Sequence, residues 1–168
     1  MTRTSLSGVT CSIARTVDIL GDAWTALILR DVLVGITRFD DIARDLGISR
    51  KVLAARLERL VDEEILERSL YCEHPPRYDY VPTPKGGELY PVLLAIMAWG
   101  DRWTAGEAGP PARIHHDSCD HEATPEVVCS HCREQLTLAD TTPYPGPGGR
   151  TGPGTLLFGP RLAAMVPR

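Results

Sequence analysis

The sequence predicts a mainly α-helical protein of the α+β class, because helical periodicity dominates residues 10–105 and one pair of short β-type segments interrupts it. Within residues 37–68, apolar side chains recur every three or four positions on both sides of a turn at Gly47. After residue 106 this periodicity ends. We therefore expect a helical domain at 10–105, a linker at 106–114, a Cys/His module at 115–142 and a flexible Gly/Pro-rich tail at 143–168.

The length and composition favour one folded domain with an appendage. The 168 residues are enough to bury a core, and no run of about 18 apolar residues is present. The first ten residues, MTRTSLSGVT, lack the apolar segment of a secretory signal. We expect a cytoplasmic protein without a membrane partner, whose five cysteines are metal ligands, redox sensors or buried thiols rather than a disulfide framework.

Two helices are predicted before the central segment. Residues 10–20 and 22–34 both carry apolar side chains at helical spacing. Gly21 is expected to separate them, and Asp22 to cap the second helix.

Residues 37–68 predict a helix-turn-helix. The turn is Gly47-Ile48-Ser49, and the second helix directs Leu53, Leu57 and Leu60 inward. Its N-terminus offers free N–H groups to a phosphate, and small alanines on its outer face allow close approach to base edges. An ordinary helical hairpin with solvated arginines is the simpler alternative. The residues expected to contact DNA on this helix are Ser49, Arg50, Lys51, Ala54, Ala55, Arg56 and Arg59.

Residues 65–72 and 77–82 predict a β-hairpin with a polar, proline-containing tip. A hairpin directly after a helix-turn-helix makes a winged helix-turn-helix, in which His74 and Arg77 could reach the flanking minor groove or the DNA backbone. The net charge of −4 leaves only a small positive surface at the start of the second helix. We therefore expect specific binding by a dimer, which doubles that surface.

A longer helix is predicted from Pro84 to about Ala105, with Thr83 as its N-cap. It is apolar nearly all round, so it must be buried on more than one side, and a twofold mate is the simplest partner. The expected homodimer interface consists of Ile13, Val17, Leu93, Ile96, Met97, Trp99 and Trp103.

Several motifs, in this order, resemble the HxlR family. They are Leu20-Gly21-Asp22-Ala23-Trp24, Arg38-Phe39-Asp40-Asp41, Gly47-Ile48-Ser49, Pro76-Arg77-Tyr78-Asp79-Tyr80, Thr83-Pro84-Lys85-Gly86 and Trp99-Gly100-Asp101. The resemblance covers roughly residues 10–104. It implies a dimeric, MarR-like transcription regulator that dimerises through its first helix and the helix after Thr83. Such a dimer would bind a pseudo-palindromic operator in double-stranded DNA, with half-sites about one helical turn apart. Its activity would respond to an unknown small molecule or a thiol modification.

Cys11 is a possible redox sensor. It lies at the start of the first helix, where thiols tend to be more reactive, and some members of the resembled family carry a responsive cysteine at this place. The alternative is a small buried apolar residue. Cys72 is expected to be structural.

The Cys/His module contains two ligand pairs, His116/Cys119 and Cys129/Cys132, each with two residues between. Such pairs can bind two edges of a tetrahedral Zn²⁺ site, so we predict one structural zinc ion per protomer. The resemblance supports this, because a subset of HxlR regulators carries a zinc-ribbon-like tail. Asp120 and Arg133 follow the two pairs, at positions usually held by glycine. The fourth ligand also has competitors, namely His115, His121 and His131. A redox dithiol, or no chemistry at all, is the alternative.

The leading function is therefore sequence-specific transcription regulation. A protein-interaction module that does not read DNA is the alternative, supported by the acidic residues between Glu58 and Glu67. An enzyme is disfavoured, because the chain shows no P-loop, dinucleotide fingerprint or nucleophile elbow.

Overall fold

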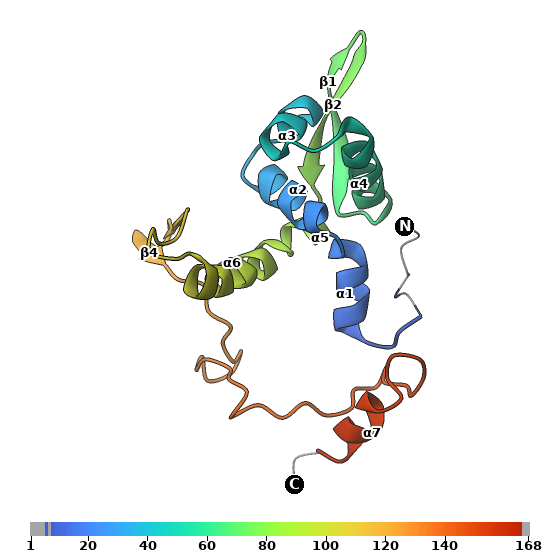
Figure 1. Ribbon diagram of the computed structural model, residues 1–168, viewed down its shortest axis with the longest axis vertical. Coiled ribbons are helices and arrows are strands. Elements are labelled where there is room, and N and C mark those ends of the chain that lie inside the picture. Colours follow the sequence, from blue (N-terminus) through green and yellow to red (C-terminus); the bar gives the residue numbers. More distant parts are fainter. Residues whose placement is uncertain (1–5, 7, 166–168) are drawn as a thin grey trace. The chain divides into compact units, whose positions relative to one another are not determined.

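The computed structural model describes residues 6 and 8–165 (Figure 1). The expectation about a secretory signal rests largely on residues 1–5 and 7, which lie outside the described residues. The chain divides into two compact units, one formed by residues up to Thr25 together with those from Leu136 onward, the other by Ala26–Gln135. These units cut across the predicted domain boundaries. Among the described residues, no helix combines the length and apolar character that crossing a membrane requires.

The core of the larger unit brings together the helix-turn-helix and the strand that follows it. It is built on α2 (Ala23–Leu33), α3 (Phe39–Leu46), α4 (Arg50–Asp62) and β1 (Leu66–Glu73). The side chains of this core come from the apolar faces that the sequence predicted. The fully buried side chains are Ile28, Leu29, Ile42, Leu53, Leu57, Leu60, Ile65 and Leu66.

The local signals at the helix ends act as expected. Gly47 adopts the left-handed conformation (φ 61°) that ends α3 and starts the turn. The Ser49 side chain accepts a hydrogen bond from the backbone N–H of Val52, which caps α4. Asp22 accepts from the backbone N–H groups of Trp24 and Thr25 at 3.0 and 3.1 Å, which caps α2.

The wing is an antiparallel hairpin of β1 and β2 (Pro76–Pro82), which projects beyond α3 and α4 in Figure 1. Leu70 pairs with Tyr78, and Cys72 with Arg77, so Tyr71 is an extra residue in a β-bulge. The chain before α3 extends this sheet. The N–H of Tyr80 donates to the carbonyl of Thr37 at 2.8 Å, and Arg38 bridges Asp79.

The helix predicted from Pro84 to Ala105 is two helices, α5 (Pro84–Gly87) and α6 (Tyr90–Thr104). Thr83 is the N-cap of α5 as predicted, accepting from Gly86 N–H at 3.1 Å. The prediction of one continuous helix is wrong because Pro91 has no N–H to donate back to Gly87. Position 86 requires glycine, since a Cβ there would lie 2.0 Å from the carbonyl oxygen of Ile65.

The Cys/His segment consists of two small hairpins. β3 (Ile114–His116) pairs with β4 (His121–Ala123), and Val128 bridges Gln135. In the other unit, α1 (Ser12–Leu20) is joined by the C-terminal segment, which was expected to be flexible but contains α7 (Phe158–Ala163) and the buried Thr155. A Cβ on Gly154 would meet Val9 at 2.8 Å, so these two segments are in close contact.

A buried carboxylate lies beside this core. Asp31 is 0% exposed, and its Oδ1 accepts from Arg30 Nε at 2.9 Å and Nη2 at 2.6 Å. Its Oδ2 has no hydrogen-bond partner among the residues that the structure describes. Burial raises the pKa of this carboxyl, and Arg30 offsets only part of that effect.

Replacing Asp31 with asparagine should alter the pH dependence of stability. Because the folded-state pKa is raised, this group favours folding below its unfolded-state pKa, and that contribution is lost as pH rises through the folded-state value. The D31N variant should therefore melt no lower than wild type at pH 7, and its melting temperature should fall less between pH 4 and 7. A large loss of stability at every pH would instead show that the ion pair with Arg30 outweighs desolvation.

Candidate nucleic-acid interface and Cys/His module

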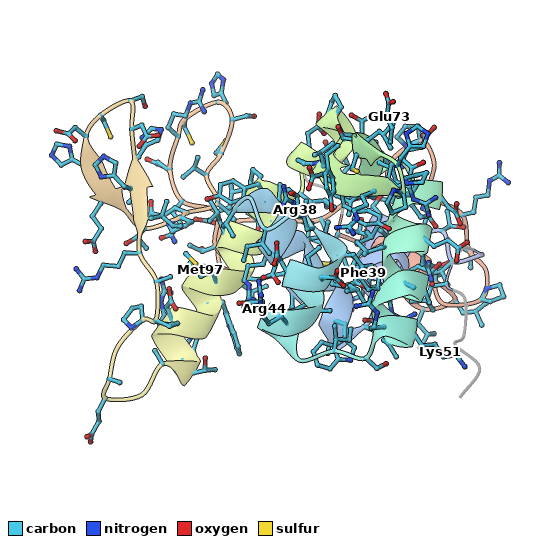
Figure 2. All side chains as sticks on the ribbon, turned by 90° about the horizontal axis from the view of Figure 1, so that it is seen from above. Arg38, Phe39, Arg44, Lys51, Glu73 and Met97 are labelled. Atoms are coloured by element: carbon cyan, nitrogen blue, oxygen red, sulfur yellow. The ribbon has the colours of Figure 1, made fainter. Side chains whose placement is uncertain are left out.

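The outer face of α4 is open to solvent at its N-terminal half. Ser49, Arg50, Lys51, Ala54 and Ala55 are all exposed, while the opposite face is buried in the core. Figure 2 shows Lys51 at the start of α4, extending away from the body of the protein. This half of the helix therefore has free access to a DNA groove.

The C-terminal half of the predicted surface is less open. Arg56 is half-buried, with its Nε removed from solvent. Arg59 is also half-buried, and its Nη2 lies 3.8 Å from Glu63 Oε1. These two predicted contacts are thus less accessible than those in the first turns.

The wing places both of its predicted residues at the surface. His74 lies in the tip and Arg77 next to it on β2, and both are exposed. The sequence argument missed Arg38, which the bridge to Asp79 fixes beside the wing. The only local signal for it was the position of an arginine just before the first helix of the helix-turn-helix.

The predicted dimer residues lie on two helices. On α6, Ile96, Trp99 and Trp103 are 56%, 63% and 70% exposed, whereas Leu93 and Met97 are half-buried. Met97 lines a cavity of about 320 Å³ with Ile114 and Ala123 (side chain labelled in Figure 2). On α1, Ile13 and Val17 are 73% and 47% exposed. Each helix thus carries uncovered apolar surface of the kind that marks an interaction site.

Cys11 is the N-cap residue of α1 and is half-buried. Its side chain makes no capping hydrogen bond, so the thiol is not held as an acceptor at the helix end. All five cysteines are free thiols.

The two predicted ligand pairs lie in two turns of the same kind. Asp120 N–H donates to the His116 carbonyl, and Arg133 N–H to the Cys129 carbonyl, each at 3.0 Å. Asp120 and Arg133 have φ of 56° and 65°, the left-handed conformation for which glycine is usual. His116 Nδ1 lies 3.2 Å from Cys119 Sγ. Each turn therefore has the backbone of a metal knuckle, although neither has the glycine.

The second turn also stabilises a thiolate. Hydrogen bonds from the backbone N–H groups of Cys132 and then His131 hold the pKa of the Cys129 thiol below its usual value. The two pairs stay on separate hairpins. Within the described part of the chain, no group of three or more histidine, cysteine or acidic side chains converges closely enough to bind a metal.

A helix-turn-helix with an exposed first turn on its second helix, followed by an antiparallel wing, defines the class of winged helix-turn-helix DNA-binding proteins. Residues 19–108 match the HxlR-like helix-turn-helix family. The uncharacterized HTH-type transcriptional regulator Rv3095 of Mycobacterium tuberculosis is 39% identical over 137 residues, which are 82% of this chain and 87% of the relative. The chain belongs to the HxlR-like helix-turn-helix family.

Rv3095 is matched over 82% of this chain, which is more than the residues before position 115 can supply, so the match continues into the Cys/His segment. Two solved structures match a similar share of this chain. PA1607, assigned as a transcription factor, has a TM-score of 0.72 at 31% identity and covers 82% of this chain and 96% of its own. PA1374 of Pseudomonas aeruginosa has a TM-score of 0.59 at 34% identity, covering 83% and 95%.

A shorter match links the chain to a redox regulator. The redox regulator HypR in its reduced form has a TM-score of 0.51 at 26% identity, covering 55% of this chain and 92% of HypR. Family and relatives together establish the general function: the protein is a helix-turn-helix transcriptional regulator and not an enzyme.

Proposed function

We propose that the protein is a cytoplasmic homodimer that binds a pseudo-palindromic operator in double-stranded DNA, one α4 in each major groove. The observation that carries the proposal is the exposed first half of α4, where Arg50, Lys51 and two small alanines lie on one open face. The exposed tryptophans of α6 support the homodimer, since a twofold mate would cover them. The wing, with Arg77, would contact the flanking backbone.

Selection from a random duplex library tests this proposal. The enriched sequences should be pseudo-palindromic, with half-sites about one helical turn apart. The affinity for them should fall steeply as salt is raised, because bound phosphates release counterions. Absence of any enriched sequence, together with salt-independent binding, would favour the protein-interaction alternative.

We further propose that His116, Cys119, Cys129 and Cys132 hold one structural Zn²⁺ per protomer. The two left-handed turns support this, because Asp120 and Arg133 adopt the knuckle backbone at the cost of a conformation that L-residues avoid. A zinc ion would draw the two hairpins together and join them by bonds from both pairs. The alternative is a Cys129/Cys132 dithiol that cycles with a disulfide.

Native mass spectrometry of reduced protein, never exposed to chelator, is expected to show a dimer with two zinc ions. The C129S variant should lose the metal, because three ligands bind a structural zinc far more weakly than four. The C72S variant is the matched control, since it removes a thiol of the wing and should retain both ions. A metal-free wild-type dimer would contradict the zinc assignment and make the dithiol the leading interpretation.

We also propose that a thiol event or a small molecule controls DNA binding, with Cys11 as the thiol. Support comes from the similarity to HypR, a redox regulator with reduced and oxidized forms, and from the position of Cys11 at the N-terminal end of α1. Comparing the operator affinity of reduced and oxidised protein tests the proposal, and equal affinities would argue against a thiol switch.

A further inference from the structure

A groove rich in arginine and aromatic side chains separates the wing from the helix-turn-helix. It has a volume of about 530 Å³ and is lined from α3, the start of α4, and both wing strands. Three of its lining residues are arginines, namely Arg38, Arg50 and Arg77. Only Arg50 and Arg77 belong to the DNA-contacting set that the sequence predicted.

Arg38 is held in this groove from two sides. Its backbone bridges Asp79, and its Nε lies 3.7 Å from the Asp79 carboxylate. The guanidinium carbon lies 4.7 Å from the ring centre of Tyr71, the extra residue of the β-bulge. The bulge therefore supplies the ring on which this guanidinium is stacked.

Arg50 is held in the same way, but on the side of the groove formed by the helix-turn-helix. Its guanidinium carbon lies 4.7 Å from the ring centre of Phe39, and its Nη1 pairs with Asp40. Both partners belong to the first turn of α3, whereas Arg50 is the first residue of α4. The two arginines are thus pre-oriented on aromatic rings in a groove that Arg77 also lines.

Stacking on a ring leaves the N–H donors of an arginine able to bind a ligand. A ring contacts the face of a guanidinium, whereas hydrogen bonds are donated along its edge, so a stacked arginine still presents planar donors that match a phosphate. The ion pairs engage one nitrogen each, Nε of Arg38 and Nη1 of Arg50. Both arginines are well exposed, with 57% and 72% of their side-chain surface accessible.

We propose that this groove binds one backbone phosphate of DNA, with Arg38 and Arg50 as its ligands, and so fixes the register of α4 in the major groove. The inference rests on the proposed DNA binding and adds Arg38 as a positioning residue. In the free protein, Asp40 is the counter-ion of Arg50, and the phosphate replaces it. The site recognises phosphate rather than bases, so it contributes affinity without sequence preference.

The test measures binding of a selected operator duplex and of a scrambled duplex over a range of salt concentrations. The R38A variant should bind both duplexes about tenfold more weakly, with their affinity ratio unchanged, and should reduce the salt slope by about one per protomer. The matched control is R68A, which removes an exposed β1 arginine that does not line the groove and should change affinity less than about twofold.

Two further variants guard against a folding defect. R38K keeps the charge but loses the planar fork, so its affinity should fall between R38A and wild type. D40N removes the competing carboxylate and should raise affinity for both duplexes. Equal effects of R38A and R68A, or a changed affinity ratio in R38A, would overturn the inference while leaving DNA binding intact. Failure of the wild-type protein to bind either duplex would instead overturn the proposed function.

Discussion

Replacing Trp99 with aspartate should convert the protein from a dimer to a monomer. Trp99 is 63% exposed in the single chain, and Trp103 one turn further along α6 is 70% exposed. If a mate covers this face, the substitution removes an aromatic anchor and buries an unpaired carboxylate. Each of these changes costs on the order of 3 kcal/mol at an interface, so the dissociation constant of the dimer should rise at least about 100-fold.

Analytical ultracentrifugation over a range of protein concentrations measures this effect. The matched control is Y144D, because Tyr144 is exposed to the same extent as Trp99 but lies outside the predicted interface. Operator binding by W99D should fall together with dimerisation, since one α4 alone reads one half-site. A W99D protein that remains dimeric would show that α6 does not form the interface.

Reversing the charge of Lys51 should abolish operator binding without altering the dimer. Lys51 is exposed in the first turn of α4, on the face that would enter the major groove (Figure 2). The K51E variant replaces an attraction to phosphate with a repulsion in both protomers. We expect affinity to fall on the order of 100-fold or more at low salt, with a smaller salt slope.

Fluorescence anisotropy with the selected operator provides the measurement. K85E is the matched control, because Lys85 is exposed and has the same chemistry but lies on α5, where it donates to the carbonyl of Glu63. Its affinity should stay within about threefold of wild type. Near wild-type binding by K51E would show that α4 does not dock on DNA through its first turns.

Local chemistry made most of the fold predictable. Caps and turn residues act within a few positions, so Asp22, Gly47, Ser49 and Thr83 marked helix ends that the structure confirms. The apolar spacing of Leu53, Leu57 and Leu60 gave the buried face of α4 for the same reason. The prediction of one helix from Pro84 to Ala105 was wrong because the apolar pattern continued through Pro91, which cannot donate the required backbone hydrogen bond.

The candidate site was only partly predictable. Arg50, Lys51 and Arg77 could be found because the residues around them form recognisable elements. The left-handed turns at Asp120 and Arg133 were not predicted, because glycine, which usually holds these positions, is absent from both. The zinc site and the homodimer interface stay predictions, since each depends on a component beyond the single chain.

The sequence by itself determined the class of the protein, because periodicity, caps and turn residues specify a winged helix-turn-helix one element at a time. Only the tertiary structure decided what surrounds its arginines. Thr37 donates to Asp79 at 2.9 Å across 42 positions, and this contact brings Arg38 against the bulged Tyr71. Such contacts are long-range, and no local propensity encodes them.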